Sequence, residues 1–308
     1  MSVLTQPLTG SLAQPSQQPT ADTLSVRFWG VRGSLPVAGP AYSVFGGRTC
    51  CVEIRCGSRL FIVDAGTGIA PFGEFLSGGK CPLDDEPGNV FDLLLSHLHL
   101  DHVMGLPFFA PALGCNNIIR VHVGNMGGSC GRKALDRLFS PPLFPVTLDE
   151  LPAQFNHIGF NAGEMLRFDD GFDVATCPLF HPDGSTAYRF DHGGRRVCYV
   201  SDIEHGSDWP PANLIEFVTG SDLVIFDAMY AAEEYARCKG WGHSTCEAGL
   251  SLCVAAGVKS MAAFHLHPRH DDERLALYEN KLNAVLPGSF VARDGFSISF
   301  PAITGRER

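Results

Sequence analysis

One short motif constrains this chain more than any other: Ser-His-Leu-His-Leu-Asp-His at Ser96–His102. It follows directly on the apolar run Phe91–Leu95, which has the character of a buried strand. The first two imidazoles alternate onto one side of an extended backbone, and the Asp and the last His fall where the chain turns towards a helix. This geometry can serve two adjacent cations from one loop. Zinc is the cation we expect, with manganese and iron as alternatives. The candidate ligands of the motif are His97, His99, Asp101 and His102.

A pair of metal ions needs further ligands, and the sequence offers them where other apolar runs end. His181, Asp202 and His265 each stand just past such a run. Taken singly, a strand-end Asp is often a turn residue and a lone His is often a packed core residue. Together with the first motif they predict a metal centre. One carboxylate must bridge two cations that lie about 3.5–4 Å apart, and Asp202 is our candidate.

Hairpin signals dominate the first part of the chain, and alternation of strands with helices dominates the last part. Strand-like runs at 50–56 and 60–63 are joined by a Gly-Ser pair, and buried runs at 223–226 and 261–264 lie among helical patterns. Residues 290–300 close the chain as a strand or a hairpin. This order predicts an α/β fold in which two mixed sheets form a sandwich with helices outside.

Composition limits the partners of the chain. Its 23 Lys and Arg residues stand against 33 Asp and Glu residues, which gives a formal net charge of −10. Such a chain is a poor non-specific partner for nucleic acid or for an anionic membrane. No apolar run approaches the roughly 18 residues that span a bilayer. Residues 1–23, rich in Gln, Pro, Ser and Thr, predict a disordered tail before one domain at 24–308.

The cysteines and the N-terminal sequence predict the compartment. Eleven cysteines are present, an odd number, and no Cys-x-x-Cys pair occurs. This pattern favours free thiols over a disulfide framework. The first 22 residues carry neither a basic start nor an apolar core of a secretory signal. We therefore expect a cytoplasmic protein.

With these motifs the chain resembles the metallo-β-lactamase superfamily, whose His-x-His-x-Asp-His signature it carries. The segment Trp241–Thr245 is similar to the Gly-His-Ser-Thr element of the ribonuclease Z-like, cyclic-nucleotide phosphodiesterase branch. The segment Leu223–Met229 resembles that branch's His-Glu-Ala-Thr strand, with Asp227 in the Glu position. The resemblance covers about 28–300 and implies the αββα sandwich of the superfamily.

The resemblance also implies roles for individual residues. It implies a hydroxide between two metals and the following ligands: His97, His99 and His181 on one metal, Asp101, His102 and His265 on the other, and Asp202 on both. It implies that His243 stands near the leaving group and that Asp227 orients it. The catalytic candidates are therefore His243, Asp227 and Asp101. Asp64 has no place among the ligands, and we expect it to orient one of them.

These features predict a di-metal hydrolase that cleaves a phosphodiester in a small substrate of the cyclic-nucleotide type. The first alternative is a nuclease that acts on RNA or DNA 3′ ends, as ribonuclease Z does. Bacterial enzymes of that kind carry a long arm between the positions of His181 and Asp202, where this chain has only a hairpin. No Lys- or Arg-rich stretch is present to grip tRNA, so we expect no stable nucleic-acid binding.

Several points stay open at this level. A lactonase or thioesterase of the same fold and a non-catalytic metal-binding sensor remain alternatives, and so does a homodimer. The roles of His267, His270 and the insert at 103–180 are not fixed by the sequence. Within that insert, the proline- and phenylalanine-rich run at 138–145 predicts either a pocket wall that stacks a base or ordinary hydrophobic filling.

Overall fold

The structure is a computed structural model that describes residues 22–78, 88–124 and 130–303. Most of the expected tail lies outside these ranges, and so does Cys81. The first described strand begins at Thr23.

The first sheet has seven strands in the order β14-β1-β2-β3-β4-β5-β6. Strands β14, β1, β2 and β3 pair antiparallel, and β3 to β6 pair parallel. The parallel strand β4 is buried along nearly its whole length, which explains why its sequence is apolar apart from Asp92. The strands are β1 (Thr23–Gly30), β2 (Cys51–Cys56), β3 (Arg59–Val63), β4 (Val90–Leu95), β5 (Ile118–Gly124), β6 (Gln154–Phe160) and β14 (Ser297–Pro301).

The second sheet also has seven strands, in the order β13-β12-β11-β10-β9-β8-β7. Strands β10 to β13 pair parallel, and β7 to β10 pair antiparallel. The hairpin predicted around residues 191–194 joins β9 to β10. The strands are β7 (Met165–Arg167), β8 (Asp173–Leu179), β9 (Ser185–His192), β10 (Arg195–Val200), β11 (Leu223–Asp227), β12 (Met261–Phe264) and β13 (Phe290–Val291).

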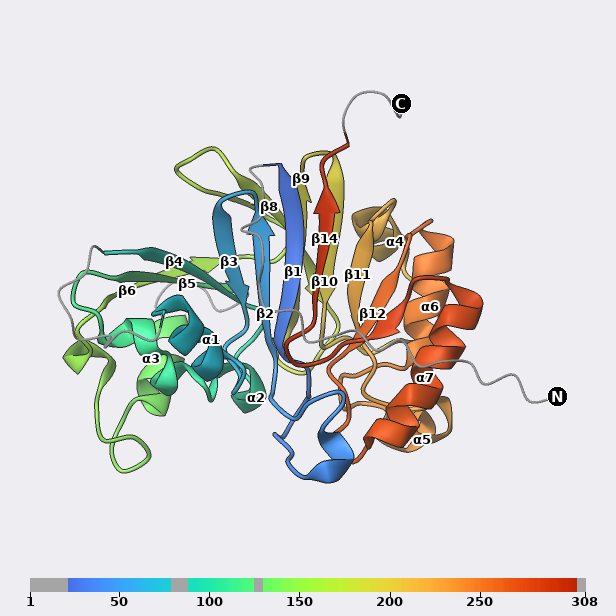
Figure 1. Cartoon of the computed structure of the whole chain (residues 1–308), viewed down its shortest axis with the longest axis horizontal. Coiled ribbons are helices and arrows are strands. Elements are labelled where there is room, and N and C mark those ends of the chain that lie inside the picture. The colour runs from blue at the N-terminus through green and yellow to red at the C-terminus, as the bar shows by residue number, and fades with distance from the viewer. Residues whose placement is uncertain (1–21, 79–87, 125–129, 304–308) are drawn as a thin grey trace.

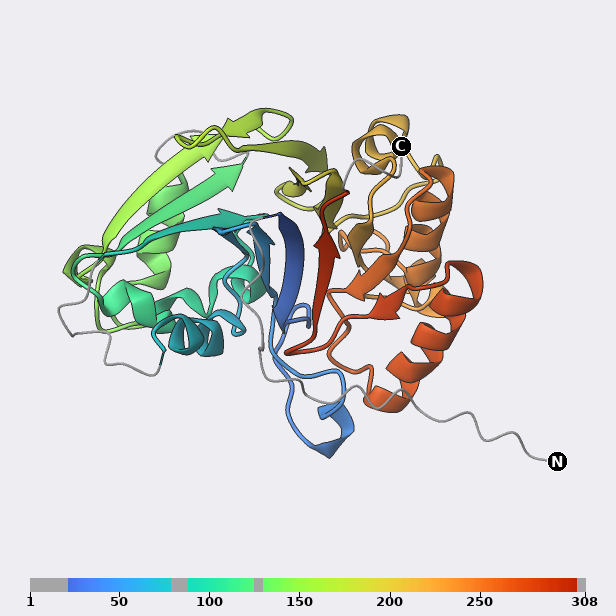
Figure 2. The same ribbon diagram turned by 45° about the horizontal axis from the view of Figure 1, so that its top comes forward.

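Helices cover the outer faces of both sheets (Figure 1). Helices α1 and α3 contact the first sheet, and α6 and α7 contact the second, as the turned view also shows (Figure 2). The α/β sandwich with helices outside is therefore confirmed. The helices are α1 (Ile69–Leu76), α2 (Leu100–Val103), α3 (Cys130–Leu138), α4 (Ala212–Val218), α5 (Ala232–Cys238), α6 (Cys246–Ala255) and α7 (Asp272–Val285), with 3-10 turns at Pro40–Tyr42, Leu106–Phe108, Ala110–Leu113 and Leu148–Glu150.

The main core lies between the two sheets. Phe28 on β1 packs against Phe264 on β12 with ring centroids 6.1 Å apart, and Phe61 on β3 packs against Phe190 on β9 at 5.2 Å. All four rings are fully buried. Burial of such rings accounts for a large share of the free energy that holds the sheets together. A rigid sandwich follows, and its strand ends can hold side chains in fixed positions.

The hairpin alternative for residues 290–300 is wrong. Strand β13 pairs with β12 in the second sheet, whereas β14 pairs with β1 in the first. The chain crosses between the sheets at Asp294, whose carboxylate accepts hydrogen bonds from the backbone of Gly47 and Arg48. The sequence analysis also missed β6, β7, α3 and α5. Strand β6 is an exposed edge strand with mixed residues, so its pattern is weak.

Candidate metal centre

The predicted site residues come together at one edge of the sandwich, where strands of both sheets end. Strands β3 and β4 run parallel, and so do β10, β11 and β12, so their carboxyl ends lie at the same edge. His99 directly precedes the short helix α2 that follows β4, and Asp101 and His102 lie within that helix. The other strand ends carry Asp64 (β3), His97 (β4), His181 (β8), Asp202 (β10), Asp227 (β11) and His265 (β12).

The backbone is strained at three of these strand ends. Asp64, Asp202 and His265 have φ angles of 62°, 61° and 54°. Residues other than glycine rarely adopt this left-handed conformation, because the side chain crowds the backbone. Such strain persists where the surrounding structure enforces it, and it gathers at functional sites.

His97, His99 and His181 form the first of two candidate ligand sets. Their ring centroids lie 4.4 to 4.9 Å apart, and one nitrogen of each can meet at a common point. The Nδ1–H of His181 donates to the carbonyl of Gly242 at 2.7 Å, which leaves its Nε2 lone pair facing His99. The Nε2 atom of His97 is buried and has no hydrogen-bond partner among the described residues. Burial lowers the pKa of His97 and of His181, so both favour the neutral form that binds metal.

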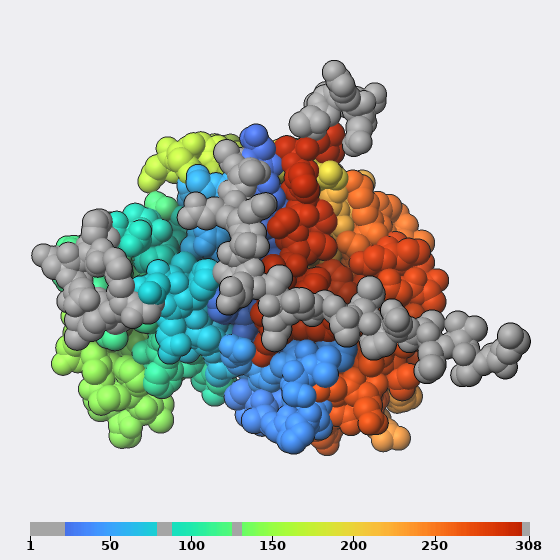
Figure 3. Space-filling model, viewed as in Figure 1, coloured from blue at the N-terminus to red at the C-terminus, as the bar shows by residue number. Residues whose placement is uncertain are grey.

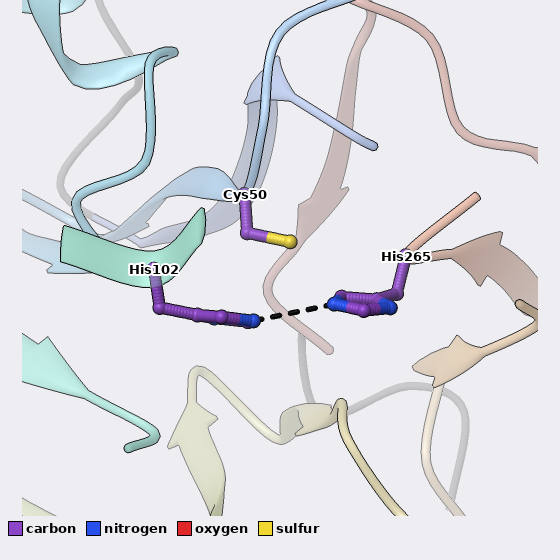
Figure 4. Close-up of side chains that lie close together, drawn as sticks. All are labelled: Cys50, His102 and His265. Atoms are coloured by element: carbon purple, nitrogen blue, oxygen red, sulfur yellow. Dashed lines mark hydrogen bonds between the residues drawn. The ribbon is translucent and has the colours of Figure 1, made fainter. Parts of the chain in front are cut away.

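Asp101, His102 and His265 form the second set. The Nε2 atoms of His102 and His265 are 3.2 Å apart (Figure 4). Oδ2 of Asp101 is 3.2 Å from Nε2 of His265. Ligand atoms about 2.0–2.1 Å from a tetrahedral metal lie about 3.3–3.4 Å from one another, so this spacing fits a cation. The backbone N–H of Ser34 donates to Asp101 at 2.6 Å and fixes that carboxylate.

Asp202 lies between the two sets, which is where a carboxylate must lie if it is to bridge two cations. Its Oδ1 atom is 3.8 Å from Nε2 of both His97 and His181, and 3.2 Å from Nε2 of His265. Its Oδ2 atom is 3.3 Å from Nε2 of His102. The carboxylate is therefore within reach of histidines from both sets.

The charges of the pocket fit divalent cations. Among the described residues, no Lys or Arg pairs with the buried carboxylates of Asp64, Asp101, Asp202 or Asp227. Burial alone would raise the pKa of Asp202, but His102, His265 and His97 outweigh it and hold that pKa well below its usual range. Burial lowers the pKa of His265, but Asp202 and Asp101 outweigh it and raise that pKa to about 9. The pocket thus favours bound positive charge.

Asp64 lies behind the ligands and contacts one of them. Its carboxylate is 2.8 Å from Nδ1 of His102 and accepts hydrogen bonds from the backbone and hydroxyl of Ser96 and from the hydroxyl of Tyr199. A carboxylate on Nδ1 directs the Nε2 lone pair of the imidazole into the site. This contact with a ligand-set histidine is the arrangement predicted for Asp64.

His243 and Asp227 form a pair beside the ligand sets. Nδ1 of His243 lies 2.9 Å from Oδ2 of Asp227. Asp227 is fully buried, and its other oxygen, Oδ1, accepts from the backbone N–H of Met229 at 3.0 Å. The His243 ring is 4.8 Å from that of His265 and 5.2 Å from that of His181. His243 stands just before α6, whose first turn Thr245 caps. A carboxylate-held imidazole therefore lies next to both sets.

Four neighbours of the site were not singled out by the sequence analysis. Cys50 was expected only as a free thiol at the start of the strand-like run at 50–56, and it lies against His102 and His265 (Figure 4). Burial raises its pKa, and its thiol donates to the carbonyl of Arg32. Tyr199 could have been suspected, because it is a tyrosine within the apolar second half of strand β10, residues 197–200. Ser34 and Glu204 act through backbone contacts that no local motif signals.

The histidines after His265 take different positions. His270 is buried, and its Nε2 lies 2.9 Å from the carboxylate of Glu234. His267 is partly exposed and stacks on His270 with centroids 4.8 Å apart. In the insert, Phe144 packs against Phe139 and Phe108, whereas Pro141, Pro142, Leu143 and Pro145 are exposed, so only part of the 138–145 run is hydrophobic filling.

Sequence comparison assigns the family. The sequence model described as a beta-lactamase superfamily domain matches residues 59–266, more than half of the chain. The chain belongs to the beta-lactamase superfamily. Similar relatives of this superfamily member include a ribonuclease Z of Bacteroides fragilis, 24% identical over 254 residues that cover 67% of this chain and 81% of the relative. A ribonuclease Z of Phocaeicola vulgatus is 30% identical over 300 residues, covering 82% and 91%. The predicted ribonuclease Z-like branch is thereby confirmed.

Solved structures share the fold of this superfamily member. They include YhfI of Bacillus subtilis, with a TM-score of 0.66 and 18% identity over 91% of this chain and 100% of that one. A diphosphatase of the PhnP family has a TM-score of 0.62 and 16% identity over 92% and 99%. Zn(2+)-bound PqqB of Methylobacterium extorquens has a TM-score of 0.64 and 14% identity over 89% and 99%. The superfamily member is a metal-dependent hydrolase with the metallo-β-lactamase fold.

Two further expectations concern the whole chain. The nine cysteines whose side chains the structure describes are free thiols, as predicted, while Cys81 and the side chain of Cys130 lie outside the described residues. Within the described ranges, no helix has both the length and the apolar character that crossing a membrane requires.

Proposed function

We propose that this superfamily member is a phosphodiesterase that holds two divalent cations, zinc first among them, and cleaves a small substrate of the nucleotide type. The ligand sets would be the two histidine clusters with Asp101, and Asp202 would serve both. Two cations held there would acidify a water towards neutrality and supply the positive charge that a phosphodiester anion needs. The chain itself, at a net charge of −10, offers little positive charge.

The observation that carries this proposal is the contact between His243 and Asp227. Since Nδ1–H of His243 donates to the buried carboxylate at 2.9 Å, Nε2 is the nitrogen that holds the second proton of the imidazolium and can give it to another atom. When a phosphodiester bond breaks, the departing alkoxide needs a proton, and a positioned imidazole is its usual donor. Hydrolysis of a thioester has less need of such a donor, because a thiolate leaves more readily than an alkoxide, whereas a lactonase differs from a phosphodiesterase in the substrate that it turns over. We assign His243 as the proton donor and Asp227 as the residue that orients it.

An end-processing nuclease is the second candidate, and the names of the relatives favour it, because several are called ribonuclease Z. Two features of this chain weigh against it. His181 and Asp202 are joined only by the tight hairpin of β9 and β10. The chain is also anionic, whereas tRNA-binding surfaces carry excess Lys and Arg. A small phosphodiester is therefore the better fit.

The test compares two substrates whose leaving groups differ in their need for a proton. Replacing His243 with Ala should lower kcat about 10²–10⁴-fold on a phosphodiester with a poor alkoxide leaving group, the usual contribution of a positioned general acid. With bis-(p-nitrophenyl) phosphate the loss should be much smaller, because nitrophenolate departs without a proton. Asp227→Asn should follow the same pattern more weakly. His157→Ala, on the edge strand β6, is the matched control and should change neither rate.

Metal content must be measured on the same preparations. It should stay at the wild-type level in His243→Ala, because His243 is outside both ligand sets. Loss of metal would instead make His243 a ligand, a role that its place 3.7 Å from Asp202 also allows. Equal loss of rate on both substrates would refute the role of proton donor. Efficient hydrolysis of lactones or thioesters with His243→Ala silent would refute the phosphodiesterase.

A further inference from the structure

Exposed apolar side chains stand next to the site residues on four separate segments. Leu35 follows Ser34, which contacts Asp101, and Leu100 directly precedes Asp101; they are 58% and 60% exposed. Phe180 precedes His181 and Trp241 precedes the Gly242-His243 pair; they are 74% and 66% exposed. Large apolar side chains that are exposed and that flank the residues of a polar site along the chain are candidates for a binding surface. The two aromatic members stand on the side of His181 and His243.

Glu204 fixes both aromatic segments to each other. Its backbone N–H donates to the carbonyl of Phe180 at 2.8 Å. Its carboxylate accepts from the backbone N–H groups of Gly240 and Gly242, each at 2.8 Å, and these two residues flank Trp241. Three hydrogen bonds from one residue therefore hold Phe180 and Trp241 in place while their side chains remain in solvent. A surface held in this way loses little conformational freedom when a ligand binds.

Gly242 brings the tryptophan segment against the site. Its φ angle is 85°, and a Cβ atom there would lie 2.3 Å from Nδ1 of His181. Only glycine permits this approach, which also forms the hydrogen bond from His181 to the Gly242 carbonyl. Trp241 is thus one residue from a carbonyl that orients a candidate ligand, and two residues from His243.

We propose that Phe180 and Trp241 form a stacking surface for a nucleobase on the leaving-group side of the site. This rests on the proposed phosphodiesterase function and names the chemical class of its substrate. A phosphate group does not stack on an aromatic ring, whereas the flat π face of a nucleobase does. Stacking of a base on an aromatic side chain changes affinity about 5- to 150-fold when the side chain is cut to Ala. The base can belong to a mononucleotide or to the end of an RNA.

Paired substrates test this stacking surface. A cyclic nucleotide is compared with the matching cyclic ribose phosphate that lacks the base. Trp241→Ala and Phe180→Ala should each raise KM for the nucleotide about 5- to 150-fold and leave KM for the base-free substrate unchanged. Trp241→Phe should keep most of the affinity. Leu277→Ala, which removes a 62% exposed side chain from α7, is the control and should change neither KM. A short RNA, tested in parallel, distinguishes an RNA end from a mononucleotide as the source of the base.

Binding without turnover gives an independent readout. Trp241 is the most exposed of three tryptophans, and Trp29 is only 6% exposed. Titration with a nucleoside monophosphate should quench tryptophan fluorescence in the wild type, ribose phosphate should not, and the signal should vanish in Trp241→Phe.

The outcomes separate the two proposals. Equal KM for both substrates in the wild type, or unchanged KM in both Ala variants, would overturn the stacking surface and leave the phosphodiesterase standing. Quenching by the nucleotide with no hydrolysis of any phosphodiester would overturn the proposed function and keep the base site. If neither nucleotide binds and the Ala variants instead lose a protein partner, the rim is a protein contact and the inference is wrong.

Discussion

Asp64 is not one of the candidate metal ligands, but its carboxylate contacts His102, a member of the second candidate set. Its carboxylate accepts from Ser96 and Tyr199 and faces Nδ1 of His102, and it is fully buried. The residue thus joins the ends of β3, β4 and β10 at one point. Its φ angle of 62° shows that the backbone accepts strain to put the carboxylate there.

Replacing Asp64 with Asn tests this role. An amide cannot accept from all of its donors, so His102 loses its orientation, and we expect metal affinity to fall about 10–100-fold. Competition with a chelator measures that affinity. Tyr199→Phe removes one donor to the same carboxylate but keeps its charge, and it should retain nearly all metal affinity. Should both variants lose stability and keep wild-type metal affinity, Asp64 has only a structural role.

At the scale of elements, the first sheet carries a buried charge cluster away from the site. Asp92 on β4 is 3% exposed and accepts two hydrogen bonds from Arg120 on β5, both at 2.7 Å. It also accepts from Arg59 on β3 at 2.8 Å. Burial raises the pKa of Asp92, but His122 and Arg120 outweigh it and lower the pKa below its ordinary value. The cluster ties three neighbouring strands together through their side chains.

The lowered pKa sets the pH dependence of this cluster. A carboxylate whose pKa is lower in the folded chain stabilises the fold above its unfolded pKa of about 3.9 and loses that contribution as pH falls. Asp92→Asn should therefore destabilise the protein by about 2–4 kcal/mol at pH 7, and the difference from wild type should shrink below about pH 4. Chemical denaturation across this pH range measures it. The control is Asp191→Asn, because the Asp191 side chain is 46% exposed in its ion pair with Arg189. It should lower the free energy of unfolding by no more than about 1 kcal/mol at any of these pH values. A constant difference for Asp92→Asn down to pH 2 would contradict the account.

Sequence patterns predicted elements and ligands well where the signal is local. The run of residues 91–95 and the following His-rich motif lie within one stretch of chain, so periodicity and residue type reveal both. Arg32 shows the opposite case. Its buried guanidinium donates to the carbonyls of Gly46, His267 and His270, and the last two contacts join loops more than 200 positions apart along the chain. No local pattern carries such information, which explains why the contacts of Cys50 and Glu204 were missed as well.

At the scale of the whole molecule, the site exists because two sheets end at the same edge. The first sheet supplies Asp64 and the His-rich motif, and the second supplies Asp202, Asp227 and His265. The loop after β1 closes the same edge beside α7, at the lower margin of Figure 3, where Val44 donates to Asp272. Residues from both halves of the chain must therefore fold together before either ligand set is complete. Metal binding and folding should accordingly be coupled.

The number of metal ions bound per chain tests the central claim most directly. Pure protein reconstituted with zinc or manganese is analysed by mass spectrometry for its metal content. We expect two ions per chain in the wild type and in the His157→Ala control. In Asp202→Ala both occupancies should fall together, because one carboxylate serves both ions, and activity should fall with them. One ion or none in the reconstituted wild type, or two ions retained in Asp202→Ala, would contradict the two-metal account.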